Sequence, residues 1–281
     1  MISNVQALSK VEKKDEFQKL IGSIELDHEQ TYDCTTLNIW SFSKSGDVRE
    51  GINIKFGNMC NGFPVDIAGL KFHNSECAYI AGAYSGIDGD SVRVQCEIAD
   101  MTNGLTCKRK YRGSNQYSRF IRNDFHTFNV QWMVYVVWQK CLQNEGFADL
   151  LKQIPVDAHV VENSSSMNKP TAIFWGAKNK ELMVARDVVA NEVAISSSFR
   201  FKKDLQRAKM IASNQINNIG SFVGKNVMGK IIKVCSLSLI YGQQPPIDFD
   251  LLRSRQIVMD GKLIQFPEIS TTKMLQMMEA C

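Results

Sequence analysis

The sequence has no cysteine or histidine pattern of the kind that holds a metal ion. None of its eight cysteines forms a Cys-x-x-Cys pair, and none of its four histidines stands at metal-ligand spacing from a cysteine. Cys141 and Cys235 fall in apolar helical stretches, where small core residues of a protein from a reducing compartment are expected. We therefore expect no metal site.

Long hydrophobic runs are also missing. No stretch approaches the roughly 18 apolar residues that a membrane-spanning helix needs, and the first residues are polar and rich in lysine, unlike a signal core. The 281 residues are 44% hydrophobic and 22% charged, as in ordinary globular proteins. We expect a cytoplasmic protein with no membrane partner. The net charge of +4 permits contact with a polyanion without requiring it.

Three common catalytic signatures are absent as well. The sequence contains no Gly-x-x-x-x-Gly-Lys-Ser/Thr phosphate loop, and its glycines at 82, 86 and 89 lie in the wrong context for a dinucleotide fingerprint. It has no Gly-x-Ser-x-Gly elbow, and its histidines do not suggest a triad. Nucleophilic serine chemistry is therefore disfavoured, and no cofactor is expected.

The pattern of apolar residues predicts an α+β fold: a mostly helical single domain with a small β-sheet. A helical extension is expected over residues 1–32, the domain over 33–244 with a charged helical insertion at about 177–222, and a C-terminal extension over 245–281. Alternation predicts a hairpin of strands 36–40 and 52–56, then single strands at 66–72 and 160–162. Helices are predicted over 75–84 with Ser75 as cap, and over 125–142, 147–153 and 226–241. Residues 85–104 are rich in Gly, Asp and Asn, with one alternating piece at 92–95.

Three carboxylates are candidates for chemistry. Asp124 precedes a long helix that is expected to be mostly buried, so on its own it is interpreted as an N-cap whose carboxylate accepts free amide hydrogens. Glu76 stands on the first turn of a predicted helix, and Glu162 ends an apolar strand. Each could stabilise positive charge on a sugar ring. The structural alternatives are a favourable helix dipole for Glu76 and a lysine partner for Glu162.

Cations and aromatic residues are mixed between residues 107 and 122. This mixture suits phosphate neutralisation and base stacking, whereas the alternative is a solvated loop. A second basic run covers residues 200–209. Trp175 could stack on a flat ligand or belong to the core.

Taken in order, these residues resemble the NADAR (YbiA-like) family of N-glycosidases. No single element is specific, but eight occur in the family's order over roughly residues 50–240. The matching elements are Asn61-Gly62-Phe63-Pro64, Asn74-Ser75-Glu76, Lys108 with Arg112, Arg122-Asn123-Asp124-Phe125 with Met133, Lys140-Cys141-Leu142-Gln143-Asn144, Val160-Val161-Glu162, Trp175-Gly176 and Gly224-Lys225-Asn226.

The resemblance implies a YbiA-like fold and hydrolysis of a base–ribose bond, in ADP-ribosylated guanine of nucleic acid or in a ribosylated riboflavin-pathway metabolite. It implies Glu76, Asp124 and Lys108 as catalytic residues. It also implies an ADP-ribose-containing ligand, with nucleic acid contacted through residues 108–122 and 200–209. The implied substrate-binding residues are Asn61, Phe63, Arg112, Arg122, Glu162, Trp175, Gly176 and Asn226.

Four positions depart from the family pattern. Cys77, Ile80, Ala83 and Ala172 stand where the family has His, Gln, Lys and Asp. The missing lysine matters most, because an imine between a lysine and the opened ribose is one mechanism proposed for the family; Lys108 could replace it. A second hypothesis is therefore a catalytically silent module that binds ADP-ribose or a nucleotide. A third is an interaction protein in which the helices serve only as a scaffold.

Overall fold

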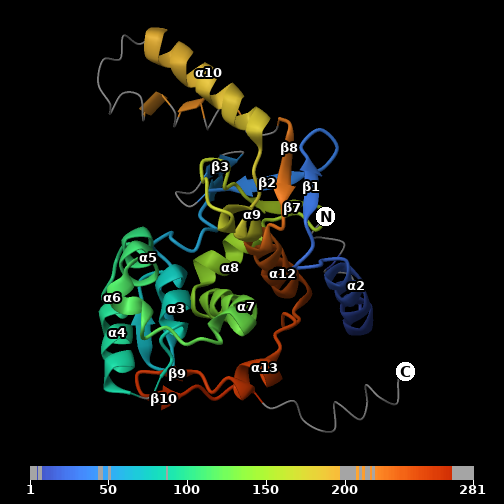
Figure 1. Ribbon diagram of the computed structural model, residues 1–281. Coiled ribbons are helices and arrows are strands. Elements are labelled where there is room, and N and C mark those ends of the chain that lie inside the picture. The colour runs from blue at the N-terminus through green and yellow to red at the C-terminus, as the bar shows by residue number, and fades with distance from the viewer. Residues whose placement is uncertain are drawn as a thin grey trace. The chain divides into compact units, whose positions relative to one another are not determined.

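The computed structural model describes residues 5, 8–43, 47–49, 52–86, 88–196, 207, 208, 211, 212, 216 and 219–267 (Figure 1). The chain divides into two compact units. The first unit is Met1–Cys60 with Glu145–Gln244, and the second is Asn61–Asn144 with Pro245–Cys281. The predicted α+β class is confirmed, although the strands form five two-stranded pairs among the described residues and not one sheet.

The first unit is built around one buried helix, α12 (Val227–Tyr241), which confirms the helix predicted over 226–241. Nearly all of its residues are buried, because it packs on strand β7 (His159–Glu162) and on helices α2 (Lys10–Gly22), α8 (Glu145–Lys152) and α9 (Thr171–Trp175). The helix ends at Gly242, whose φ of 65° is a left-handed cap that glycine adopts without strain.

The N-terminal helix α2 is part of this core. Ser9 and Glu12 form a capping box at its start, in which each side chain accepts from the other residue's backbone N–H. Phe17 then packs with Leu237 and Tyr241 of α12. The described part of the predicted extension at residues 1–32 is therefore anchored in the first unit.

The strand pairing differs from the sequence prediction. Strand β2 (Ile39–Phe42) pairs in parallel with β7, and β4 (Ile52–Ile54) pairs with β3 (Asp47–Arg49). The predicted hairpin of 36–40 with 52–56 is therefore wrong. All four residues of β2 are buried, as is typical of a parallel strand covered on both faces. Strand β1 (Gln30–Asp33) pairs antiparallel with β8 (Ser221–Gly224).

Helix α10 (Lys180–Ser196) lies within the predicted insertion at 177–222 and confirms its helical character. The basic run at 200–209 lies outside the described residues except for residues 207 and 208. Among the helices that the structure describes, none combines the length and the apolar character needed to cross a bilayer.

The second unit is centred on helix α3 (Ser75–Gly82), all of whose residues are buried. It packs on α4 (Gly89–Ala99), α5 (Gly104–Gly113) and α7 (Phe125–Gln143). Helix α7 confirms the helix predicted over 125–142, and a short helix α6 (Asn115–Ser118) follows α5.

Two segments predicted to be non-helical are helices. The alternating piece at 92–95 lies inside α4, because Asp88 accepts from the Ser91 N–H and starts a helix there. The basic segment 107–122, interpreted as a loop, includes most of α5 and all of α6, whose N-caps are Asn103 and Ser114. Asp88 and Asn103, which belong to the Gly-, Asp- and Asn-rich stretch 85–104, are thus helix caps.

The segment predicted as one strand over 66–72 is a hairpin. Strands β5 (Val65–Ile67) and β6 (Leu70–Phe72) pair antiparallel, and Ala68 and Gly69 form the two-residue turn with φ values of 55° and 93°. Two consecutive positive φ angles are those of a type I′ turn, which matches the twist of the strands. The Asp66 carboxylate accepts from the Gly69 N–H at 2.8 Å.

The described part of the C-terminal extension completes the second unit. It contains helix α13 (Phe249–Ser254) and the pair of strands β9 (Val258–Met259) and β10 (Lys262–Leu263). The ring of Phe266 contacts that of Tyr135 on α7 with centroids 5.1 Å apart. The segment 245–267 therefore packs on the unit formed by residues 61–144.

We predict that Ala68→Asn stabilises the protein by roughly 0.5–1 kcal/mol, because asparagine tolerates the left-handed conformation better than alanine. Gly69→Ala should destabilise it by about 1 kcal/mol or more, since its φ of 93° is strained for any residue with a Cβ. Urea unfolding of both variants measures these changes. Equal effects of the two variants would contradict the turn type.

Candidate functional site

Glu76 occupies the first turn of α3, in the second unit. The Asn74 side chain caps this helix by accepting from the Cys77 N–H at 3.1 Å, so the predicted cap Ser75 is wrong by one residue. Only 5% of Glu76 is exposed. A carboxylate at this place gains from the helix dipole but loses hydration, so it needs a positive partner.

Lys108 supplies that partner from α5. Its Nζ lies 3.3 Å from Glu76 Oε1, and 45% of the lysine side chain is exposed. Two residues predicted to be catalytic are therefore brought into one ion pair, buried at the carboxylate end and solvated at the ammonium end. An ion pair with this asymmetry leaves the lysine able to reach a ligand.

Arg112, one helical turn after Lys108 on α5, extends the positive charge. Its guanidinium carbon lies 5.2 Å from the ring centroid of Phe125, a cation–π distance. The Phe125 ring in turn lies 5.3 Å from that of Tyr79 on α3. Burial, which dominates, and the charge of Glu76 raise the pKa of Tyr79, while Arg112 lowers it.

Tyr79 was not among the predicted site residues. It follows Glu76 by three positions and so lies on the same face of α3, which is the signal that could have identified it. Glu76, Tyr79, Lys108, Arg112 and Phe125, here called the Glu76 cluster, combine one carboxylate with two cations and two rings.

The loop predicted to bind substrate is fastened to this cluster's helix. The Asn74 Nδ2 donates to Asn61 Oδ1 at 3.2 Å, so the residue that caps α3 also holds Asn61. The Lys140 Nζ lies 5.4 Å from the centroid of the Phe63 ring. The Asn144 Nδ2 donates to the Pro64 carbonyl at 2.7 Å. The loop 61–64 is thus fixed between the start of α3 and the end of α7.

Asp124 stands at the N-cap position of α7, but its side chain makes no capping hydrogen bond. The interpretation as a side-chain cap is wrong. Its carboxylate instead accepts two hydrogen bonds from Arg122, at 2.6 and 2.9 Å, and the Arg255 guanidinium lies 3.8 Å away. Arg122 is oriented by donating also to Ser85 Oγ and to the Arg255 carbonyl, each at 2.6 Å. The hydrogen bonds from Arg122 lower the pKa of Asp124 despite its partial burial.

The remaining predicted residues, Glu162, Trp175, Gly176 and Asn226, lie in the first unit. The Asn226 side chain is completely buried and joins the end of β7 to the start of α12. Its Oδ1 accepts from the Glu162 N–H at 2.9 Å, and its Nδ2 donates to the Val160 carbonyl at 2.8 Å. Its backbone is left-handed, with a φ of 53°. Asn226 thus has a structural role in addition to the predicted one.

Two glycines permit this hydrogen-bonded contact between the end of β7 and the start of α12, here called the Asn226 joint. A Cβ on Gly229 would lie 2.3 Å from the Val160 carbonyl oxygen, and one on Gly176 would lie 2.5 Å from that of Glu162. Such contacts are too close for any side chain. The Gly176 carbonyl accepts from the Asn226 N–H at 3.1 Å, which ties Trp175-Gly176 to the same joint. The Trp175 ring is half-buried and packs edge-to-face on Phe174. Ligand binding by these four residues stays a prediction.

Comparison with known proteins gives no match by sequence and a distant likeness by structure. No protein-family profile matches the sequence, and no curated protein matches it. Among solved structures, the chain is similar to the NMR structure of the E. coli protein YbiA, with 19% identity, a TM-score of 0.38, and coverage of 64% of this chain and 86% of that chain.

We predict that Asn226→Gly lowers the free energy of unfolding by about 2–4 kcal/mol, because it leaves a buried N–H and a buried carbonyl without their partner. Because glycine adopts the left-handed backbone without strain, the lost stability measures the side-chain amide of Asn226. Gln256→Gly is the matched control, since Gln256 has a φ of 47° and an exposed side chain. Equal stabilities of the two variants in urea would contradict this role.

The lowered pKa of Asp124 predicts an acid-sensitive contribution to stability. A carboxyl group with a folded pKa below its unfolded value of about 3.9 stabilises the fold fully above that value. The contribution is lost as the pH falls through the lower, folded pKa. Asp124→Asn and Arg122→Met should therefore flatten the fall of stability between about pH 5 and pH 2, measured by urea unfolding. If both variants lost stability at low pH as steeply as the unmodified protein, the result would argue against the ion pair.

Proposed function

We propose that the chain is an N-glycosidase that hydrolyses a base–ribose bond, and that its substrate is ADP-ribose attached to guanine in nucleic acid. The observation that carries this proposal is the Glu76–Lys108 pair, a carboxylate with 5% exposure beside a half-exposed ammonium. In the ordered motifs that resemble the NADAR family, Glu76 matches the family's carboxylate, whereas the family's lysine position holds Ala83, and Lys108 would take its place.

The chemistry needs one carboxylate close to the sugar. As the bond between ribose C1 and the base nitrogen breaks, the electron pair leaves with the nitrogen and C1 becomes positively charged. We assign to Glu76 the stabilisation of this charge and the removal of a proton from the attacking water, whose oxygen bonds to C1. A proton then returns to the departing base nitrogen. Two arginines contact the Asp124 carboxylate and keep it ionised. We therefore assign to Asp124 the stabilisation of positive charge and not the donation of a proton.

The cations of the Glu76 cluster suit the diphosphate. Lys108 and Arg112 lie on one face of α5, and an exposed guanidinium can hold a phosphate through two hydrogen bonds. Two other cations between residues 107 and 122 already have acidic partners: Lys110 contacts Glu97, and Arg122 contacts Asp124. Nucleic-acid contact through 108–122 and 200–209 is therefore the part of the proposal that needs a test of its own.

A catalytically silent ADP-ribose-binding module is the second candidate. Cys77, Ile80 and Ala83 are fully buried, and Ala172 is 2% exposed. The four positions where the resemblance implies His, Gln, Lys and Asp are thus filled by small or apolar core residues. This observation favours a chain that keeps its binding groups but has lost part of its chemistry.

We predict that Glu76→Gln slows the release of ADP-ribose from an ADP-ribosylated guanine oligonucleotide by about 100-fold or more, the usual contribution of a general base. Chromatography of the released ADP-ribose measures the rate. Lys108→Met should weaken substrate binding. Glu145→Gln, which changes an exposed carboxylate at the start of α8, is the control and should keep full activity.

Two outcomes decide between the candidates. Binding of the oligonucleotide without release, unchanged in Glu76→Gln, would establish the silent module and overturn the enzyme. Release from a ribosylated riboflavin-pathway metabolite, but not from the oligonucleotide, would keep the glycosidase chemistry and replace the substrate.

A further inference from the structure

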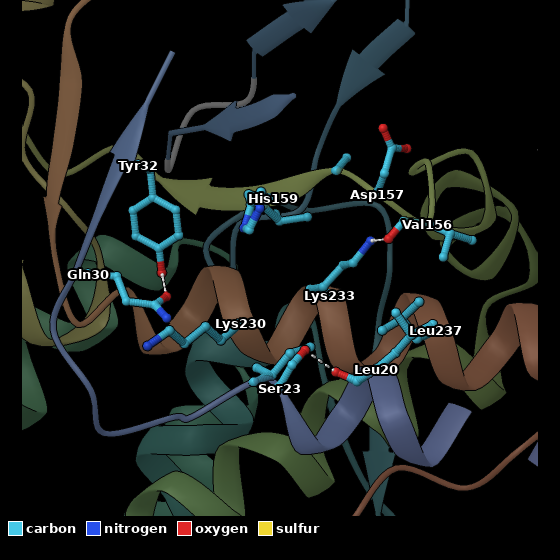
Figure 2. A pocket seen from close by; sticks show the side chains of 13 residues that line it. Leu20, Ser23, Gln30, Tyr32, Val156, Asp157, His159, Lys230, Lys233 and Leu237 are labelled. Carbon is cyan, nitrogen blue, oxygen red and sulfur yellow. Dashed lines mark hydrogen bonds between the residues drawn. The ribbon is translucent and has the colours of Figure 1, made fainter. Parts of the chain in front are cut away.

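The first unit contains a cavity of about 250 Å³ between α2, β1, β7 and α12 (Figure 2). This volume is slightly below that of common ligand sites, so it suits a small molecule. Aliphatic side chains form one part of its wall, and polar groups form the other. The aliphatic residues include Leu20, Ile24, Val156 and Leu237, and the polar ones include Gln30, Tyr32, His159, Lys230 and Lys233.

The two lysines are unusual because they belong to the buried helix α12. Lys230 is 5% exposed and Lys233 is 8% exposed. Figure 2 shows Lys230 directed toward Gln30 and Lys233 directed toward Val156, so they mark two ends of the cavity wall. Removing an ammonium group from water is costly unless other groups compensate its charge.

Backbone carbonyls provide only part of that compensation. The Lys233 Nζ donates to the carbonyls of Pro155 and Val156, each at 2.8 Å. The Lys230 Nζ donates to those of Glu25 and His28, each at 2.6 Å. An ammonium carries three N–H groups, so each lysine keeps one further donor. No carboxylate in the described part of the chain forms an ion pair with either lysine.

Burial dominates the pKa values of the ionisable groups in the cavity wall, and the charge of Lys233 acts on its neighbour His159. Burial lowers the pKa of Lys233 to about 8, with Asp157 opposing the effect. Burial and then the charge of Lys233 lower the pKa of His159. A bound anion would reverse both effects, because it would stabilise the protonated forms.

We propose that this cavity binds a small monocarboxylate, whose carboxylate accepts from the Lys233 Nζ and whose hydrocarbon chain lies against Leu20, Ile24 and Leu237. The aliphatic wall favours a carboxylate with an apolar body over inorganic phosphate, which would leave that wall in contact with water. This site lies wholly within the first unit and does not depend on the proposed glycosidase activity.

Hexanoate is a suitable probe for the full chain. Titration into protein with ¹³C-labelled Leu and Val methyl groups should shift the resonances of Leu20, Val156 and Leu237, with a Kd on the order of 1 mM or tighter. Hexanol has the same chain without the charge and should bind at least about tenfold more weakly. No shift with hexanoate, or equal binding of hexanol, would overturn the proposal. So would tighter binding of inorganic phosphate.

Lys233→Met should lower the hexanoate affinity about tenfold or more, because it removes the charged donor. Lys152→Met is the matched control, since Lys152 is an exposed lysine on α8 that pairs with Asp149. Circular dichroism verifies that each variant is folded. An equal loss in both variants, or no loss in folded Lys233→Met, would contradict the assignment.

The unmodified protein gives a test that needs no variant. Four ionisable groups line the cavity around Lys233: Asp157 just before β7, His159 on β7, Tyr32 on β1 and Lys230 on α12. The residues that α2 contributes to the cavity wall are uncharged. Hexanoate stays ionised at neutral and alkaline pH, so the lysine is the group that titrates. The affinity should fall about tenfold from pH 7 to pH 9, as Lys233 loses its proton near pH 8. A constant affinity over this range would overturn the role of Lys233.

Discussion

The first unit depends on one buried amide. The Asn226 side chain bonds to the backbone on both sides of Val161 in β7, while its own N–H bonds to the Gly176 carbonyl. These contacts require a left-handed backbone at Asn226 and the lack of a side chain at Gly229. Several residues that look like a scattered ligand-binding set are therefore also the parts of one joint. A buried polar network of this kind specifies a single packing, because any other arrangement leaves its groups unpaired.

Buried charge is handled differently in the two units. Glu76 has a counter-ion, Lys108, whose ammonium remains partly in water. Lys230 and Lys233 are held by carbonyl dipoles, which lower the cost of burial without neutralising the charge. The first arrangement pairs a buried carboxylate with a cation, and the second holds two buried ammonium groups with backbone carbonyls.

The apolar helices of this chain could be predicted from local patterns, whereas the polar helices α4 and α5, the strand pairing and the side-chain partners could not. The apolar stretch of α7 and that of α12 needed no knowledge of distant residues. The partner of β2 is β7, about 120 residues away, and nothing local to either strand specifies it. Asp124 had the right position for a cap, but Arg122 bound it more strongly than the helix amides did. Glu76 and Lys108 could be named from the sequence, whereas Tyr79 has only its three-residue spacing from Glu76 as a signal, and its contact with Phe125 required the structure.

The parallel pairing of β2 with β7 has a consequence for how the chain acquires its structure. The first unit joins Met1–Cys60 to Glu145–Gln244, so β2 cannot pair until the ribosome has synthesised β7. All of residues 61–144 leave the ribosome in that interval. These residues already contain α3, α5 and α7, whose contacts span shorter sequence distances and form more readily. The Glu76–Lys108 pair would then form while β2, three of whose four residues are apolar, is still without its partner. That interval is when the nascent chain is most exposed to aggregation.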